Sequence, residues 1–374
     1  MTEPAPREPD ALEGAPHPRQ TARLYGQRAA ETAFLDAYTG GRLHHGWLIG
    51  GPRGVGKATL AWRIARFLLT RPEDEGGLFA PPPPTDLSCP QDHPALRRVL
   101  ALSEPRLFLL RRGYDEKKER WQEVISVDEM RRMRGFLSLS AADGGRRVVI
   151  IDTVDEMNPA AANALLKTLE EPPALTTLLL VSHQPARLLP TIRSRCRELR
   201  LSPLGPADLA AALAQAGGTV PAGAETALAE LAGGSVGGAF SMVGMDGLET
   251  YAALVGLMSD LPRLSRPKVQ KLAEAGAARG SDSRFDLIVG LIDLFLARLA
   301  RAAASGQAPP EAAPGEARLI GRLAAGGPPA ARAWAELAQG LGLRARRGKA
   351  VNLDPAALVM DMVFRIEETS LALA

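Results

Sequence analysis

A glycine-rich segment constrains the fold of this chain more than any other part of its sequence. Residues 51–57 read Gly-Pro-Arg-Gly-Val-Gly-Lys and fit the pattern G-x-x-x-x-G-K. The apolar run 47–49 precedes this segment, and residues 57–69 follow it with apolar side chains at helical spacing. A strand, a glycine loop and a helix in this order form a P-loop, in which backbone N–H groups and Lys57 surround phosphate oxygens. The sequence therefore predicts a P-loop fold.

Apolar runs that are typical of buried strands recur through the first two hundred residues. They lie at 107–110, 148–151 and 178–181, an alternating run follows at 197–201, and segments of helical spacing separate them. This order predicts a parallel α/β sheet, whereas after Pro203 we find only helical patterns. The expected domains are a disordered tail at 1–20, a P-loop α/β domain at 21–203, a helical lid at 204–245 and a helical C-terminal domain at 246–374.

The composition excludes several classes of protein. Lys and Arg exceed Asp and Glu by 45 − 42 = 3, which is a small excess for a protein that coats nucleic acid. The two cysteines, Cys89 and Cys196, are too few for a disulfide framework or a four-thiolate zinc site. No apolar run approaches ~20 residues, so we expect no membrane-spanning segment and a reduced, cytoplasmic setting. The Pro-rich residues 1–20 lack the apolar core of a signal peptide.

The residues expected to act on magnesium depart from those of working P-loop ATPases. Ala58 follows Lys57, where a Ser or Thr hydroxyl would bind the metal, and Thr59 lies one place later, turned by about 100° around the helix. Asp152 ends an apolar run and is well placed to hold magnesium through water. Thr153 then stands where many such ATPases carry a Glu that orients the attacking water. Nucleotide binding without efficient turnover stays open, and magnesium binding is in doubt.

Two further acids lie close to Asp152. Asp155 and Glu156 precede Asn158, which we expect to cap the next helix with Pro159 in its first turn. We interpret both acids as charges that complement the dipole of this helix. His183, which follows a predicted strand, is interpreted as non-catalytic.

Two motifs together are specific to one family. Residues 163–173 read Asn-Ala-Leu-Leu-Lys-Thr-Leu-Glu-Glu-Pro-Pro, and residues 191–196 read Thr-Ile-Arg-Ser-Arg-Cys. With the segment 144–158, they resemble the AAA+ clamp-loader subunits of bacterial DNA polymerase III. The resemblance is strong over about 18–204 and weaker through the lid. It implies an AAA+ base, a small helical lid and a C-terminal helical collar that joins subunits.

The resemblance also assigns roles to single residues. Arg195 matches an arginine finger, which reaches the nucleotide of a neighbouring subunit, while Ser182 matches the first sensor position. The alternative for Arg195 is that it caps a loop or pairs with an acid. Gly238 stands where active relatives carry a lid arginine, and this third departure favours a subunit that does not hydrolyse ATP. The expected nucleotide-binding residues are Gly51, Gly54, Gly56, Lys57, Thr59, Asp152 and Ser182.

The implied partners are those of a clamp loader. They are the motor subunits and the clamp-opening subunit of a hetero-oligomer, the sliding clamp, and primed DNA contacted through the complex. The chain would then lack catalysis of its own but belong to a DNA-directed DNA polymerase holoenzyme. Relatives carry a four-cysteine zinc module where this chain has only Cys89 with Asp92 and His93, so we expect no zinc. An autonomous AAA+ ATPase acting on DNA or protein is the alternative, and a small-molecule kinase fits less well.

Overall fold

The computed structural model describes residues 8, 11–12, 14–71, 83–138, 145–277 and 282–373. The chain divides into two compact units. The first contains Met1–Gly218 and Ser235–Gly237, and the second contains Thr219–Gly234 and Gly238–Ala374. The lid expected at 204–245 is shared between these units, and its boundaries stay a prediction.

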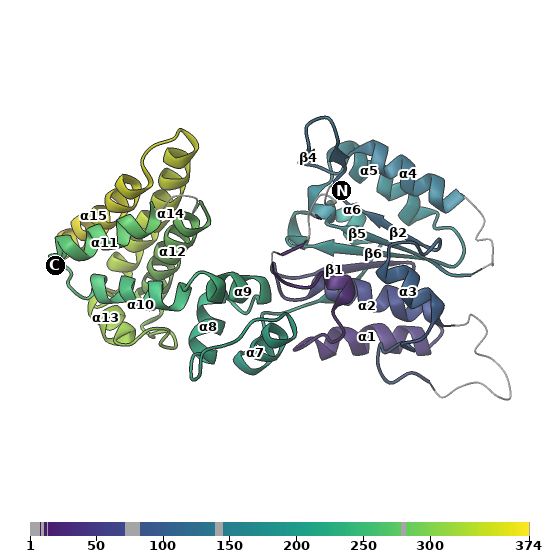
Figure 1. The fold of residues 1–374 in the computed structure, drawn as a ribbon, viewed down its shortest axis with the longest axis horizontal. Helices are drawn as coiled ribbons and strands as arrows, with labels where there is room; N and C mark the ends of the chain where they lie inside the picture. The colour runs from purple at the N-terminus through teal and green to yellow at the C-terminus, as the bar shows by residue number, and fades with distance from the viewer. Residues whose placement is uncertain are drawn as a thin grey trace, which may run out of the picture. The chain divides into compact units, whose positions relative to one another are not determined.

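A parallel sheet forms the centre of the first unit (Figure 1). Its strands are β1 (Gly46–Gly50), β2 (Leu107–Leu110), β5 (Arg147–Asp152), β6 (Thr176–Ser182) and β7 (Arg197–Arg200). They lie in the order β2-β5-β6-β1-β7, and every neighbouring pair is parallel. All residues of β1 and β6 are buried, as the continuous apolar runs predict. The α/β class expected for this part of the chain is confirmed.

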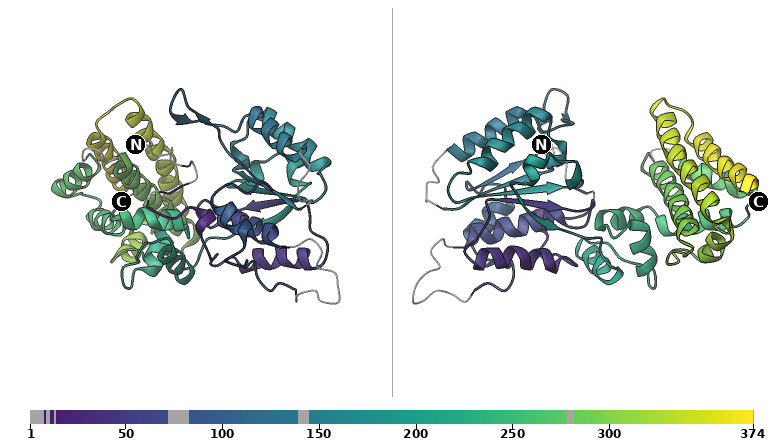
Figure 2. Two further views of the ribbon diagram at one scale, coloured as in Figure 1. Left: turned by 45° about the vertical axis from the view of Figure 1, so that its right-hand side comes forward. Right: turned by 180° about the vertical axis from the view of Figure 1, so that it is seen from behind.

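Helices cover both faces of the sheet (Figures 1 and 2). One face carries α1 (Arg28–Thr39), α2 (Lys57–Thr70) and α3 (Pro94–Leu100), and the other carries α4 (Val127–Ser138) and α5 (Pro159–Glu170). Successive side chains of a strand point to opposite faces. Accordingly, Val148 and Ile150 of β5 pack in the core with α1 and α2, while Val149 and Ile151 pack with α4 and α5. The helix α5 begins as expected, because the Asn158 side chain accepts a hydrogen bond from the Ala161 N–H at 2.8 Å.

The end of the expected disordered tail is in fact packed. Residues Pro18–Gln20 form a short 3-10 helix, and His17 is 7% exposed with its ring edge-on to Trp62. The buried Arg66 guanidinium donates hydrogen bonds to the carbonyls of Arg19 and Thr21, and these bonds hold the segment against α2. The expectation of disorder is therefore wrong for 17–20. Residues 1–7, 9–10 and 13 of that tail lie outside the described residues.

The region 114–123, which the sequence presents as a charged excursion, includes a small hairpin. Its strands are β3 (Tyr114–Asp115) and β4 (Arg120–Trp121), which pair antiparallel. The Tyr114 ring meets the Trp121 ring edge-on at 5.3 Å, and the Arg111 guanidinium lies over the same indole. These ring contacts hold the hairpin near the end of β2.

Helices are the only regular elements among the described residues of the second unit. Its helices are α8 (Glu225–Ala232), α10 (Gly247–Met258), α11 (Arg266–Gly276), α12 (Asp282–Ser305), α13 (Glu316–Leu323), α14 (Gly327–Ala350) and α15 (Pro355–Leu373). The helix α7 (Pro206–Gln215) belongs to the first unit, and α9 (Val236–Gly244) begins there. A buried ion pair joins Arg298 and Glu316, which are 3% and 1% exposed and 2.8 Å apart. The helical class expected after Pro203 is confirmed for the described residues.

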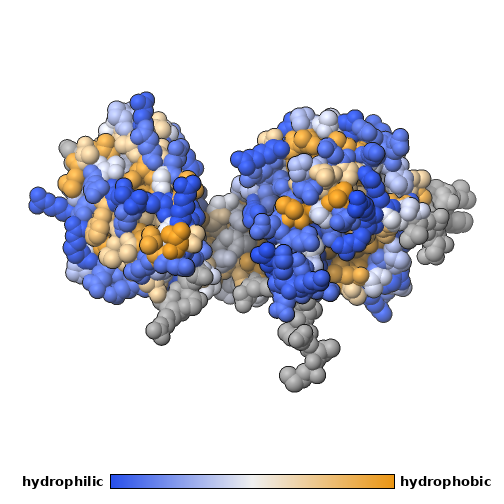
Figure 3. Space-filling view, turned by 90° about the horizontal axis from the view of Figure 1, so that it is seen from above, coloured by the Kyte–Doolittle hydropathy of each residue, from blue (hydrophilic) through white to orange (hydrophobic). Residues whose placement is uncertain are grey.

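Apolar side chains at the surface are dispersed. On the face seen in Figure 3, hydrophobic and hydrophilic side chains are interspersed over both units. Exposed apolar residues near the end of α14 include Leu343, Val351 and Leu353. Within the described part of the chain, no helix is both long enough and apolar enough to cross a bilayer.

Candidate functional site

Three glycines shape the loop between β1 and α2. Gly51, Gly54 and Gly56 have φ angles of 151°, 75° and 99°, which side chains rarely allow. A Cβ atom at Gly51 would lie 2.4 Å from the carbonyl oxygen of Leu201. A Cβ atom at Gly54 would lie 2.0 Å from the Ser235 hydroxyl oxygen. The chain therefore has the predicted strand, glycine loop and helix, while nucleotide binding by these glycines stays a prediction.

Lys57 begins α2 and is turned back onto its own loop. Its side chain is 3% exposed, and its ammonium group donates a hydrogen bond to the carbonyl of Pro52. Burial lowers the pKa of Lys57 to about 8, and the carboxylates of Asp152 and Asp155 oppose this decrease. A desolvated ammonium with only partial compensation favours an added anion, as a phosphate-binding lysine requires.

Asp155 has a role that its interpretation as a helix-dipole charge missed. Its carboxylate accepts hydrogen bonds from the Ser182 hydroxyl at 2.8 Å, the His183 N–H at 2.5 Å and the Gln184 N–H at 3.3 Å. It thereby ties the loop after β5 to the end of β6. Ser182, the predicted sensor, is fully buried, and its hydroxyl donates its hydrogen bond to this carboxylate. The only sequence signal for Asp155 is a second acid three residues after Asp152.

His183 lies next to the same cluster. Burial is the largest cause that lowers the pKa of His183, to about 4, and the positive charges of Lys57 and Arg53 lower it further. Its imidazole is therefore neutral near pH 7. His183 thus lies close to Lys57, Arg53 and Asp155, although the sequence alone presents it as non-catalytic.

This site lacks two side chains that metal-assisted hydrolysis normally uses. Thr59 lies half-buried in the first turn of α2, one residue beyond the place of a metal-binding hydroxyl. Thr153 is 6% exposed, and its neutral hydroxyl cannot replace a carboxylate that orients an attacking water. The glycine loop and Lys57 have the form of a phosphate site, whereas a hydroxyl at position 58 and an acid at position 153 are absent. The binding roles of Thr59 and Asp152 stay predictions.

A segment that the sequence assigns to the lid lies against the glycine loop. The Val236 N–H donates a hydrogen bond to the Gly54 carbonyl at 2.9 Å, and Ser235 occupies the space beside Gly54. These residues belong to the first unit together with the loop. Gly238 follows within α9 and brings no guanidinium to the place where active relatives carry one.

Arg195 lies at the amino ends of the strands, whereas the glycine loop lies at their carboxyl ends. It precedes β7, which runs parallel to β1 with Arg197 opposite Trp47 and Arg200 opposite Gly50. The glycine loop leaves β1 after Gly50, at the carboxyl ends of the strands, whereas Arg195 lies at their amino ends. At roughly 3.3 Å per residue, the length of β1 separates Arg195 from the loop, so its side chain cannot reach the phosphate site of its own chain.

Two acceptors hold the Arg195 guanidinium. Its Nη2 lies 2.9 Å from the Glu170 Oε1, and its Nη1 donates a hydrogen bond to the Thr191 carbonyl at 3.0 Å. The side chain of Arg195 is 36% exposed. The pairing with an acid that the sequence leaves open for Arg195 is therefore present, and the guanidinium is still accessible from solvent. Burial raises the pKa of the neighbouring Cys196 to about 12, so this thiol is not a nucleophile near neutral pH.

The residues near the expected zinc position have other contacts. The His93 Nδ1 accepts a hydrogen bond from the Ala95 N–H at 3.1 Å and caps α3. Among the residues that the structure describes, no group of three or more His, Cys, Asp and Glu side chains could hold a metal ion. The expectation that the chain binds no zinc stays a prediction.

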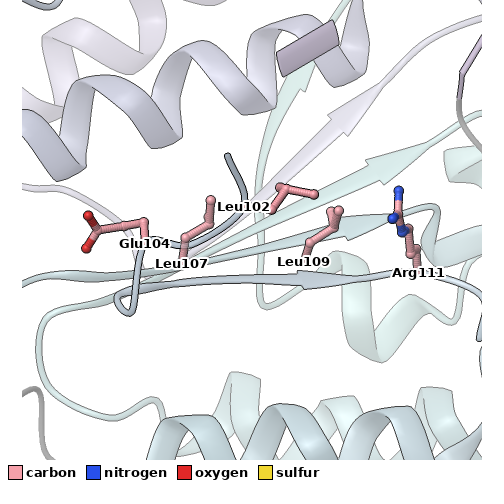
Figure 4. A pocket seen from close by; sticks show the side chains of 5 residues that line it. All are labelled: Leu102, Glu104, Leu107, Leu109 and Arg111. Carbon is pink, nitrogen blue, oxygen red and sulfur yellow. The ribbon is translucent and has the colours of Figure 1, made fainter. Parts of the chain in front are cut away.

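A separate pocket lies along the edge strand β2. Its volume is about 160 Å³, and Figure 4 shows its lining by Leu102, Glu104, Leu107, Leu109 and Arg111. Its charged groups already have partners, since Glu104 pairs with Arg98 and Arg106, and Arg111 pairs with Glu8. None of its lining residues belongs to the predicted site.

Comparison with known proteins shows which proteins the first half of the chain resembles. Residues 26–205 match the family model described as DNA polymerase III, delta subunit. The chain is 40% identical to the DNA polymerase III subunit delta' of Pseudomonas aeruginosa over 200 residues. The aligned segment covers 52% of this chain and 55% of that protein. Over this segment the chain is similar to the delta' subunits of DNA polymerase III. The resemblance stated from the sequence motifs is confirmed.

Two more relatives show how far the similarity extends. The Escherichia coli K12 subunit delta' is 33% identical over 170 residues, 46% of each chain. The chain thus spans about half the length of the curated relatives it matches. Among solved structures, a gamma subunit-related protein of Thermotoga maritima covers 90% of this chain and 99% of its own, with 17% identity and a TM-score of 0.35.

Proposed function

We propose that this chain is a delta-prime-type clamp-loader subunit that completes the ATPase site of a neighbouring subunit with Arg195 and does not hydrolyse ATP itself. One observation carries the proposal. Arg195 lies accessible at the amino ends of the strands, opposite its own glycine loop, so any nucleotide that it contacts must be bound by another chain. The similarity to delta' subunits of DNA polymerase III supports the same conclusion.

The chemistry of arginine suits this role. A guanidinium keeps its charge at any physiological pH and binds phosphate oxygens through a planar pair of N–H groups. Placed on the transferred phosphoryl group, Arg195 would stabilise the negative charge that develops in the transition state. The neighbouring chain would supply the glycine loop, the magnesium ion and the attacking water.

The residues at the glycine loop of this chain support the proposal that it does not hydrolyse ATP. It lacks the metal-binding hydroxyl at Ala58, a general base at Thr153 and the lid guanidinium at Gly238. Each of these groups serves a different part of phosphoryl transfer. If ATP binds at the glycine loop and Lys57 of this chain, we expect it to stabilise the assembly of the complex and not to be hydrolysed.

The proposed partners follow from the similarity to delta' subunits. We place the chain in a hetero-oligomer with the motor subunits and the clamp-opening subunit, which together load the sliding clamp on primed DNA. The relatives that this chain resembles include proteins named as the delta', gamma and tau subunits of DNA polymerase III. The helical second unit would form the collar that joins the subunits, and the complex would act in the cytoplasm.

The decisive test is Arg195→Ala in a reconstituted complex. The motor subunits that Arg195 does not complete would carry P-loop lysine substitutions, so that only the neighbouring site turns over. Loss of an arginine finger lowers turnover by roughly 10³-fold or more, and we expect a decrease of this size with the complex intact by gel filtration. Arg193→Ala is the matched control, since Arg193 is an exposed arginine in the same turn. Equal turnover in both variants would remove the proposed role of Arg195.

The alternative of an autonomous ATPase rests on Lys57, at the start of α2, and Asp152, at the end of β5, which this chain retains. It requires steady ATP hydrolysis by the isolated chain that Lys57→Ala abolishes. We expect no such hydrolysis, because the magnesium ligand and the base are missing.

A further inference from the structure

The contacts of Arg195 within its own chain extend the proposed function, on which this inference rests. Glu170 is the last residue of α5 and contributes its Oε1 to the ion pair with Arg195 at 2.9 Å. Thr191, four residues before Arg195, contributes its backbone carbonyl. Both acceptors come from the subunit that carries the finger, so the guanidinium is not free in this chain.

A phosphate group and the Glu170 carboxylate compete for the same cation. A triphosphate that approaches Arg195 brings several negative charges within a few ångströms of a carboxylate, and like charges at this separation repel. Arg195 must therefore weaken or leave its pair with Glu170 when it binds phosphate. The Thr191 carbonyl carries no net charge and imposes no such conflict.

We propose that Glu170 is a latch that holds Arg195 on its own subunit until the triphosphate of the neighbouring subunit displaces it. Glu170 is thus a positioning residue that sets how much ATP is needed to engage the finger, and it takes no part in the chemical step. Because the pair opposes engagement, its removal makes engagement easier.

The exposure of the pair fits a contact that opens and closes. The side chains of Arg195 and Glu170 are 36% and 48% exposed, so water and salt weaken their attraction. Exposed pairs of this kind change an equilibrium constant by about 1.4- to 5-fold. By comparison, the side chains of the Arg298–Glu316 ion pair are only 3% and 1% exposed, so water and salt screen that pair much less.

The test is Glu170→Gln in the reconstituted complex in which only the neighbouring site turns over. We expect the ATP concentration at half-maximal rate to fall about two- to five-fold, with the maximal rate unchanged. At about 1 M salt, where the Debye length is about 3 Å, the difference from the unmodified complex should vanish. Glu171→Gln is the matched control, because Glu171 is exposed and makes no ion pair among the described residues. It should leave both kinetic values unchanged.

The outcomes separate the latch from the finger. If Arg195→Ala abolishes turnover while Glu170→Gln changes neither value, the latch is wrong and the finger stands. A raised half-maximal concentration or a lower maximal rate in Glu170→Gln would show that Glu170 orients the guanidinium, which also overturns the latch. If Arg195→Ala has no effect, the proposed function fails and the latch fails with it. Glu170→Ala, which removes the carboxylate differently, should shift the half-maximal concentration in the same direction.

Discussion

The carboxyl and amino ends of the strands in the central sheet retain different parts of an ATPase site. At the carboxyl ends of the strands, the glycine loop and Lys57 keep the shape of a phosphate site, but the residues for metal binding and water activation are absent. At the amino ends, Arg195 keeps an accessible guanidinium beside a carboxylate. Under the proposed function, the glycine loop keeps the form of a phosphate site, while the group that acts in hydrolysis is Arg195 at the amino ends of the strands.

The glycine loop offers the largest expected change in stability. Gly51→Ala places a Cβ atom 2.4 Å from the Leu201 carbonyl oxygen at a φ of 151°. We expect it to lower the free energy of unfolding by about 2–4 kcal/mol, because the strain and the clash add. Urea titration checks this change, and Gly205→Ala, where a Cβ atom meets nothing within 4 Å, is the control. An unchanged free energy of unfolding in Gly51→Ala would show that the surrounding fold does not require this loop conformation.

Lys57 offers the next largest effect. Burial lowers its pKa from 10.5 to about 8, so in the unfolded chain Lys57 keeps its proton to higher pH. The free energy of unfolding should therefore rise with pH between about 8 and 10.5, by about 3 kcal/mol, as the cost of burying the charge disappears. Lys57→Met should be more stable than the unmodified chain near pH 7 and should lack this rise. Thermal unfolding at several pH values measures both.

The result for Lys57 would also sharpen the comparison between the carboxyl and amino ends of the strands. In a working P-loop the same substitution abolishes hydrolysis, whereas here it should be neutral for turnover of the complex. Instability of Lys57→Met at pH 7 would instead indicate that the ammonium has a stabilising partner that outweighs its burial.

His183 provides the smallest effect. Because burial and nearby cations lower the pKa of His183 from 6.5 to about 4, the folded chain resists protonation that the unfolded chain accepts. Stability should be full above pH 6.5 and fall as the pH decreases from 6.5 towards 4, with about 2 kcal/mol of the loss between pH 7 and pH 5. His183→Gln should remove this part of the acid sensitivity, as unfolding curves at pH 7 and pH 5 would show. The same loss in both proteins would contradict the buried, neutral imidazole.

The sequence predicts the sheet, the glycine loop and the cap at Asn158 because each depends on residues that are close together in the chain. Apolar runs specify buried strands, and Asn158 and Pro159 specify a helix start. The bonds of Asp155 to residues 182–184 and the pair of Arg195 with Glu170 join segments about 25 residues apart. No spacing rule identifies such pairs, since they depend on which loops meet at one edge of the sheet. The packing of residues 17–21 was not predicted for the same reason. Its contacts are made by Trp62, against the His17 ring, and by Arg66, which donates to the carbonyls of Arg19 and Thr21, and both lie on α2.

The most direct test compares the carboxyl and amino ends of the strands within one complex. Steady-state ATP turnover would be measured at the single active neighbouring site with Arg195→Ala and, separately, with Lys57→Met. We expect roughly 10³-fold loss or more for Arg195→Ala and no change for Lys57→Met. The reverse pattern, with turnover lost on replacing Lys57 and kept on replacing Arg195, would contradict the central claim that this chain lends its guanidinium and leaves its own site idle.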